Sequence, residues 1–429
     1  MVMRPVRRRG AALMSRRAVL AIVLAVAVVA AASVVAVLRL RTPLPAPAVH
    51  VTAPAQLVLA AGTPPAVPSP TAGGFLLEAS DGTELASTAA DTPRPIASVA
   101  KVMTALVVLQ AQPLAAGADG PLLTLTEQDV AFFRDEQAAD GSVVPVTAGE
   151  ALTERQLLLA LLLPSANNIA DTLAVWVSGG VAAFVARENA AAAALGMTAS
   201  HFDDASGVSA STVSTPRDLV RLAAAAMAVP ALADIVQTQT AALPDGTALH
   251  NLDILLAANG DWLGIKTGWT PSAGGCLLFA ARHAYTGSAQ LLTLYGAALG
   301  QSAEASVDAD HPELGGAFSA ARAGESAAVG GYAALDLATL TPAVRGSVDT
   351  AWDEASGVVA HPIHATALAR LGQSVSVTLS PKVVGDSLPA GTVVATLNGP
   401  GSGKVRLAWP VVTTSDITGP SWWWHLLHG

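Results

Sequence analysis

The stretch of sequence that governs the fold of this chain spans residues 95–104 and reads PIASVAKVMT. Pro95 comes directly before a helical pattern of apolar residues, so we expect a helix to begin near Ser98. Ser98 then lies in the first turn, where free N–H groups and the helix dipole favour developing negative charge. Lys101 follows one turn later on the same face, so its amine can reach the serine hydroxyl. The lack of charge elsewhere in the stretch predicts that this helix is buried.

Lysine is rare in this chain. Among 23 basic residues only four are lysines, at positions 101, 266, 382 and 404. Arginine cannot lose its proton in a protein, whereas a desolvated lysine can become a base. A lysine retained three residues after Ser98 therefore predicts a serine nucleophile with Lys101 as its base. Taken alone, the pair is better explained as a capping serine and a lysine that reaches solvent, because Ser-x-x-Lys is common.

A second signature, Ser165-Ala166-Asn167, follows an apolar helical stretch over residues 156–163. Pro164 ends that helix, so the signature falls on a loop before the next one. A hydroxyl and an amide two residues apart on a loop can face one cleft. Ser165 is then expected to pass a proton to the leaving amine, and Asn167 to hold a substrate amide. The alternative, that both residues cap the next helix, stays open at this point.

A third signature, Lys266-Thr267-Gly268, ends an apolar strand that begins near residue 263. Residues 276–281 are expected to form its hairpin partner. Gly268 allows backbone and ligand to approach closely, while Lys266 and Thr267 offer a cation and a hydroxyl to a substrate carboxylate. A single Lys-Thr-Gly is weak evidence. Three motifs in this order are strong evidence, with Ser165 67 positions after Ser98 and Lys266 101 positions after Ser165.

The three signatures in this order resemble those of the serine-type D-Ala-D-Ala carboxypeptidases, the low-molecular-mass penicillin-binding proteins of bacterial wall maturation. The resemblance extends from about residue 73 to residue 340 and includes the residues that flank the motifs. It implies an α+β fold of the penicillin-binding-protein/β-lactamase-like transpeptidase type. Such a fold has a five-stranded antiparallel sheet with helices on both faces and a helical subdomain, which here carries Ser165.

The resemblance also implies a mechanism. Ser98 attacks the D-Ala-D-Ala peptide bond of a peptidoglycan stem peptide after Lys101 takes its proton. The terminal D-Ala leaves with help from Ser165, and water hydrolyses the acyl-enzyme. The backbone N–H groups of Ser98 and Trp269 are implied to form the oxyanion hole. β-Lactam antibiotics are implied to be covalent inhibitors, and no cofactor is expected.

Two rival functions share these residues. An active-site serine β-lactamase of class A uses Ser-Asp-Asn and a deacylating glutamate. Here Ala166 occupies the middle position, and residues 197–207 contain Asp203 and Asp204 but no glutamate. A catalytically silent wall-binding protein is the other rival, and the intact Ser98 argues against it. One local departure from the family pattern is Asp253, since many relatives have Asn-x-Asn before the strand of Lys266.

The first 41 residues carry eight arginines and no acid. A basic segment over residues 1–17 precedes an uncharged apolar run over residues 18–38. At about 1.5 Å per residue, that run spans roughly 31 Å, the thickness of a bilayer core. The positive-inside rule then predicts a single-pass protein of the cell membrane with the rest of the chain outside the cytoplasm. A cleaved signal peptide is the alternative, and it also exports the domain.

The chain is expected to divide further along its length. Residues 42–73 are rich in Pro and Ala and predict an extended spacer. Residues 74–340 would form the carboxypeptidase domain, which is expected to begin with two strands joined by a turn at Asp81-Gly82. Residues 341–429 would form a small β-rich domain, with strands expected over 373–379 and 391–397. Three adjacent tryptophans, residues 422–424, either dip into the membrane interface or pack on the β domain.

The net charge and the number of cysteines argue against nucleic-acid binding and against disulfide or cysteine-based metal sites. Beyond residue 41 the chain holds 15 basic and 32 acidic residues, a net charge of −17, which argues against nucleic acid as a partner. Cys276 is the sole cysteine, so neither an internal disulfide nor a cysteine-based zinc site is possible. It lies in an apolar stretch that predicts a buried, inert thiol. His361 and His364 are separated by a proline, and we expect no metal site.

Overall fold

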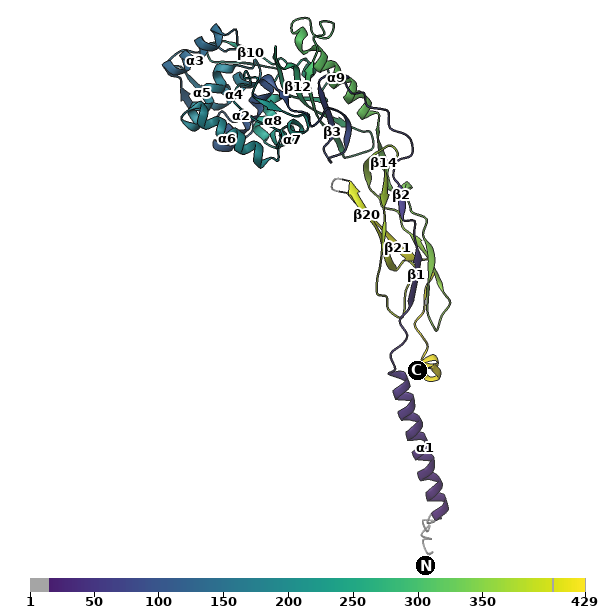
Figure 1. Ribbon diagram of the computed structural model, residues 1–429. Coiled ribbons are helices and arrows are strands. Elements are labelled where there is room, and N and C mark those ends of the chain that lie inside the picture. The colour runs from purple at the N-terminus through teal and green to yellow at the C-terminus, as the bar shows by residue number, and fades with distance from the viewer. Residues whose placement is uncertain (1–14, 403–404, 429) are drawn as a thin grey trace, which may run out of the picture. The chain divides into compact units, whose positions relative to one another are not determined.

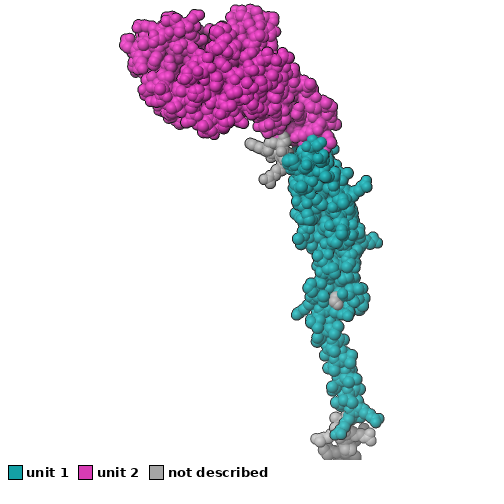
Figure 2. All heavy atoms as spheres, in the orientation of Figure 1, with its two compact units in different colours: residues 1–57, 337–365, 374–429 teal, residues 58–336, 366–373 magenta. Residues whose placement is uncertain are grey.

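A computed structural model describes residues 15–402 and 405–428 of the chain (Figure 1). The predicted basic segment therefore lies largely outside the described residues. The chain divides into two compact units, shown in different colours in Figure 2. The larger unit comprises residues 58–336 and 366–373, and the smaller unit comprises residues 1–57, 337–365 and 374–429.

A five-stranded antiparallel sheet forms the centre of the larger unit, as expected. Its strands run in the order β11-β12-β13-β3-β4. The expected hairpin about Asp81-Gly82 is β3 and β4, and the strand of Lys266 with its partner is β11 and β12. The strands are β3 Gly74–Ala79, β4 Glu84–Thr88, β11 Trp262–Thr270, β12 Gly274–Ala284 and β13 Leu291–Gln301.

Helices cover both faces of this sheet, as predicted (Figure 1). Side chains alternate along each strand, so Leu76 faces one layer of helices while Phe75 and Leu77 face the other. The face of Phe75 packs on α9 (Pro312–Val329) through Phe318. The opposite face packs on the helical layer that carries the first two predicted signatures. This burial on both sides explains why the central strands lack polar alternation.

The helical layer contains eight elements. They are η1 Ala97–Ala100, α2 Lys101–Ala111, α3 Glu127–Ala138, α4 Glu154–Leu162, α5 Asn167–Ser178, α6 Val181–Ala194, α7 Pro216–Met227 and α8 Pro230–Val236. A further turn, η2 (Ile254–Ala257), precedes β11. Four short strand pairs complete the larger unit: β5 Arg94–Pro95 with β8 Val213–Ser214, β6 Leu122–Thr124 with β7 Ala151–Thr153, β9 Thr240–Ala242 with β10 Ala248–His250, and β14 Tyr332–Asp336 with β17 Thr366–Arg370.

The smaller unit holds a six-stranded antiparallel sheet in the order β1-β15-β16-β21-β20-β19. Its interior includes Trp409 and a cluster of valines and other apolar residues. The strands are β1 Ala48–Thr52, β15 Arg345–Asp349, β16 Ser356–Ala360, β19 Thr378–Pro381, β20 Val393–Ser402 and β21 Val405–Thr413. A separate pair joins β2 (Gln56–Val58) to β18 (Ser374–Ser376), and η3 (Leu337–Thr339) begins the C-terminal part.

Three predicted features of this region differ from the structure. Residues 42–73 are not a plain spacer, because β1 pairs with β15 from Ala48 opposite Asp349 to Thr52 opposite Arg345. The alternation of Val49 and Val51 with polar residues carries that strand, although proline-rich flanks mask it in the composition. The strand expected over 373–379 is broken where Val377 donates to Ala55 O, which moves the chain from β18 to β19. Residues 366–373 also return to the larger unit instead of staying in the C-terminal domain.

The N-terminal apolar run is helix α1 (Arg16–Leu40), which is long and apolar enough to cross a membrane. Beside its last turn lies the short helix α10 (Trp422–His428), which contains the three tryptophans. Arg39 Nη1 donates to Leu426 O at 2.9 Å, and the ring of Trp424 meets Trp352 edge to face at 5.8 Å. Trp422 and Trp423 stack on each other and are each 56% exposed.

Candidate active site

The first signature lies where a 3₁₀ turn passes into a buried helix. η1 carries half-buried Ser98, and α2 begins at Lys101, close to the predicted start. Ala97 has a φ of 48°, in the left-handed region that non-glycine residues rarely adopt. Strain of this kind is kept where surrounding structure demands it, and here it precedes the predicted nucleophile.

Lys101 is fully buried and makes three hydrogen bonds. Its Nζ lies 2.8 Å from Ser98 Oγ, 2.7 Å from Asn167 Oδ1 and 2.8 Å from Ser206 O. Both carbonyl oxygens can only accept, so they use both N–H groups of a neutral amine. The remaining lone pair is then directed at the Ser98 hydroxyl. This arrangement suits removal of the serine proton.

Burial lowers the pKa of Lys101 to about 7, although the carboxylates of Asp204, Glu136 and Asp171 oppose the shift. Desolvation has this direction for an amine because it penalises the charged form. An ordinary lysine is protonated near neutral pH, whereas this one is available in both forms. Lys101 therefore has the protonation behaviour of a general base.

The second signature brings Ser165 and Asn167 to the same place. Ser165 has a φ of 67° and is 3% exposed, and its Oγ has no hydrogen-bond partner among the described residues. A strained residue with an unpaired buried hydroxyl is expected where a substrate completes the hydrogen bond. Asn167 begins α5 and turns its Oδ1 to Lys101. The helix-capping alternative does not hold, since neither side chain caps α5.

The third signature runs along β11 beside η1. Lys266 is 2% exposed, and burial together with the charge of Lys101 lowers its pKa to about 7. A Cβ on Gly268 would lie 2.9 Å from the backbone N of Ser98, so only glycine lets this strand pass the serine at that distance. Thr267 and the half-exposed Trp269 flank it.

Asp253, the departure noted in the sequence, is buried, with 4% of its surface exposed. Its Oδ1 caps η2 by accepting from Leu255 N at 3.0 Å, and burial raises its pKa to about 6. The charges of Asp253 and Lys266 favour each other.

A cleft of about 210 Å³ joins the signatures. Ser98, Ser165, Thr267, Gly268 and Trp269 line it, while Lys101, Asn167 and Lys266 lie behind the lining. Five further lining residues have no signal in a single sequence: Ser142, Leu252, His311, Glu313 and Leu314. His311 and Glu313 come from the start of α9 and approach each other at 3.5 Å.

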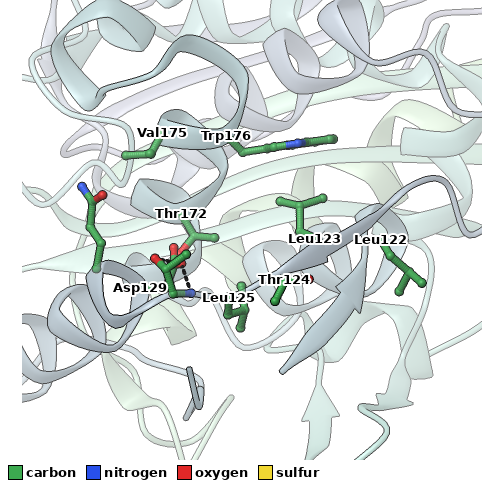
Figure 3. A pocket seen from close by; sticks show the side chains of 10 residues that line it. Leu122, Leu123, Thr124, Leu125, Asp129, Thr172, Val175 and Trp176 are labelled. Carbon is green, nitrogen blue, oxygen red and sulfur yellow. Dashed lines mark hydrogen bonds between the residues drawn. The ribbon is translucent and has the colours of Figure 1, made fainter. Parts of the chain in front are cut away.

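A second hollow, of about 370 Å³, lies between β6, the start of α3 and the side of α5. Figure 3 shows Trp176 and Val175 on one side of it and Leu123 and Leu125 on the other. None of the predicted site residues lines this hollow. Although it is larger, the predicted site residues surround the smaller cleft.

Cys276, on β12, is buried, and burial raises the pKa of its thiol to about 12. The thiolate that a cysteine nucleophile needs is therefore absent near neutral pH. Ser98 faces no competing nucleophile from this residue.

Comparison with known proteins agrees with this geometry. Residues 63–291, more than half of the chain, match the family model described as D-alanyl-D-alanine carboxypeptidase. The chain belongs to the D-alanyl-D-alanine carboxypeptidase family. Its match to the carboxypeptidase of Streptomyces sp. strain K15 is 33% identical and covers 52% of this chain and 83% of that protein. A carboxypeptidase of Mycobacterium tuberculosis is 36% identical over 50% of this chain and 71% of its own length.

Other family comparisons concern the fold and the type of cleavage. A solved structure of a mutant Streptomyces K15 DD-transpeptidase is 30% identical, with a TM-score of 0.52, and the match covers 60% of this chain and 99% of that one. The shared part confirms the expected penicillin-binding-protein fold. A D-alanyl-D-alanine endopeptidase of Escherichia coli is 32% identical, over 44% of this chain and 59% of that protein.

Proposed function

We propose that this serine-type D-Ala-D-Ala carboxypeptidase acts through an acyl-enzyme on Ser98, with Lys101 as the general base. The observation that carries the proposal is the 2.8 Å contact between Ser98 Oγ and the Nζ of a fully buried lysine. Its substrates are peptidoglycan stem peptides that end in D-Ala-D-Ala. β-Lactam antibiotics would acylate the same serine and remain bound.

The acylation step begins when Lys101 Nζ accepts the proton of Ser98. The serine oxygen adds to the carbonyl carbon of the penultimate D-Ala, and the oxyanion is stabilised by the backbone N–H groups of Ser98 and Trp269. The C–N bond then breaks. The proton taken from Ser98 returns to the leaving amine through Ser165 Oγ, so that D-Ala departs neutral at nitrogen and the ester remains on Ser98.

Substrate binding is proposed to use the other signature residues at the cleft. Lys266 and Thr267 would hold the terminal carboxylate, and Asn167 would donate to a backbone carbonyl of the stem peptide. Water then hydrolyses the ester, with Lys101 again accepting a proton. The missing deacylating glutamate over residues 197–207 favours slow release of bound β-lactams, in contrast to a β-lactamase.

The length and apolar composition of α1 support a proposal for placement in the cell. We propose that it spans the cell membrane once, with the arginine-rich start in the cytoplasm and the chain beyond residue 41 outside. This places the enzyme where its substrate, the cell wall, is made and trimmed.

An endopeptidase acting on cross-linked wall is the second candidate, because several relatives of similar identity carry that name. The two activities differ in the group that leaves: a carboxypeptidase releases a single terminal D-Ala, whereas an endopeptidase releases the second peptide of a cross-link. Incubation with a linear pentapeptide fragment and with a cross-linked dimer, each assayed for its product, separates them.

Ser98→Ala is expected to abolish covalent labelling by a fluorescent penicillin and release of D-Ala from a pentapeptide, while the melting temperature stays close to that of the wild type. The substitution removes the attacking oxygen from a half-buried position, so its effect on packing is small. Ser211→Ala, on an exposed turn serine without a lysine three residues later, is the matched control. Undiminished labelling of the Ser98 variant would move the nucleophile elsewhere.

A further inference from the structure

One carboxylate in the site has no part in the steps above. Glu136 lies near the end of α3, and its Oε2 accepts from Asn167 Nδ2 at 2.7 Å. The other end of the same amide faces Lys101, since Asn167 Oδ1 lies 2.7 Å from Nζ. The asparagine amide therefore bridges a carboxylate and the general base.

The orientation of this amide decides what Lys101 can do. With Oδ1 toward Lys101, the amine donates both N–H groups to oxygen and keeps its lone pair for Ser98. With the amide turned over, an N–H of Nδ2 would face the amine and occupy that lone pair. A carboxylate accepts only, so Glu136 stabilises the first orientation and opposes the second.

The loop after α3 is built around this contact. Gly141 N donates to Glu136 O at 2.8 Å, and Asn167 N donates to Ser142 O at 2.7 Å. A Cβ on Gly141 would lie 2.5 Å from Glu136 Oε2 and 2.9 Å from Asn167 Nδ2. The absence of a side chain at residue 141 is thus what leaves room for the pair.

We propose that Glu136 is a positioning residue that fixes the amide of Asn167, and through it directs the lone pair of Lys101 to Ser98. It touches neither Ser98 nor Lys101 by a hydrogen bond, so it acts through Asn167. The inference rests on the proposed roles of Ser98 and Lys101 and assigns to α3 a part in the chemistry that none of the three signatures contains.

The test uses the full-length protein and a fluorescent penicillin at saturating and subsaturating concentrations. This separates the first-order acylation rate constant from the half-saturating concentration. Glu136→Ala is expected to lower the rate constant by roughly 10–100-fold, the range for losing a hydrogen bond to a charged group. Glu136→Gln keeps an acceptor for Asn167 Nδ2 and is expected to stay within about twofold of the wild type, as uncritical substitutions do.

Two further variants sharpen the comparison. Asp135→Ala removes the neighbouring exposed carboxylate of the same helix and is expected to leave acylation unchanged. Gly141→Ala inserts a methyl group against the pair and is expected to reproduce the loss seen with Glu136→Ala. Thermal melting of each variant checks that the fold is retained. If one of the two loss variants, Glu136→Ala and Gly141→Ala, melts early, the comparison with Glu136→Gln uses the other.

The outcomes distinguish this inference from the proposed mechanism. Peptide mapping of the labelled wild type away from Ser98 would overturn the mechanism itself. Labelling at Ser98 with wild-type rates in Glu136→Ala and Gly141→Ala would overturn the role of Glu136 alone. Equal losses in Glu136→Ala and Glu136→Gln would show that a neutral acceptor for Asn167 Nδ2 does not suffice, and would overturn the proposal that Glu136 acts by orienting the amide.

Discussion

Lys101 and Lys266 are two buried amines whose opposite protonation states are both needed in one cleft. The pKa of each is lowered to about 7, in both cases first by burial. The charge of Lys101 lowers the pKa of Lys266 further, so the two groups titrate as a pair. The base must be neutral to accept a proton, while the cation that holds a carboxylate must be charged.

The pH dependence of kcat/KM for D-Ala release is therefore expected to be bell-shaped with its maximum near pH 7. Below that value Lys101 gains a proton and acylation slows, and above it Lys266 loses its charge and KM rises. Lys101→Arg keeps the positive charge but cannot act as a base, and a loss of about 10²–10⁴-fold is expected at every pH. If the arginine variant retained more than about a tenth of the activity, Lys101 would act by charge alone.

Residues of the site differ in how far they were predictable. Ser98, Lys101 and Lys266 lie in short signatures, and the order of the three signatures predicted them as site residues. Glu136 and Ser142 come from the end of α3 and its following loop, and no local pattern marks them. Their positions depend on tertiary packing against Asn167, which single-sequence reasoning does not reach.

At the scale of elements, the passage of β11 beside η1 sets the shape of the cleft. Gly268→Ala is expected to reduce penicillin acylation by roughly tenfold or more, because its Cβ would lie 2.9 Å from Ser98 N and 3.0 Å from Val99 N. The backbone movement needed to relieve these contacts would displace the Ser98 N–H, the donor proposed for the oxyanion hole. Gly260→Ala, just before the same strand and with nothing within 4 Å, is the control and should act like the wild type. Full activity in the Gly268 variant would show that β11 can move away from η1 without loss of acylation, which would contradict the prediction.

A buried carboxyl joins α6 to α2. Thr104 Oγ1 lies 2.6 Å from Ala205 O and 2.9 Å from Glu188 Oε1, yet it has one proton to donate. The carbonyl takes that proton, so the contact with Glu188 requires a protonated carboxyl. Burial raises the pKa of Glu188 to about 8, which agrees with this count.

Glu188→Gln is expected to flatten the pH dependence of stability. In the unfolded chain this carboxyl releases its proton near its ordinary pKa of 4.5, whereas the folded state keeps it to about 8. The folded state then binds more protons, so this group makes the free energy of unfolding fall as pH rises from 4.5 to 8. Denaturant unfolding at several pH values measures the slope, and a slope unchanged in the variant would contradict the assignment.

Elements with local patterns matched expectation better than those with distant partners. The hairpin of β3 and β4 and the strand of Lys266 carry their pairing within a few residues. β1 shows a similar alternation, but residues 58–336 separate it in the sequence from its partner β15. Its proline-rich flanks gave this segment the composition of a linker. The division of the chain was therefore the weakest part of the prediction, because it depends on a contact between segments about three hundred residues apart.

At the scale of the whole molecule, removing the proposed anchor alone and removing it together with the edge strand β1 are expected to have different effects. Removal of residues 1–41 is expected to give a soluble enzyme that still releases D-Ala, because α1 ends before β1 begins. Removal of residues 1–57 also takes away β1 and leaves β15 as an exposed edge, a known cause of aggregation. Size-exclusion chromatography and D-Ala release compare the two, and equal solubility and activity would mean that β1 adds little to the sheet.

The pairing of β1 with β15 also has a consequence for the order in which the protein matures. Ala48 lies opposite Asp349, so the first strand of the small sheet is synthesised long before its neighbour exists. Residues 58–336 form one continuous stretch with most of the contacts of the larger unit, so they can begin to fold while later strands are still on the ribosome or in transit. β1 must meanwhile wait with its edge unpaired, at a synthesis rate of about 5–20 residues per second for some tens of seconds. Its brevity and its flanking prolines are then an advantage during export, because a short strand bounded by prolines makes a poor template for wrong partners.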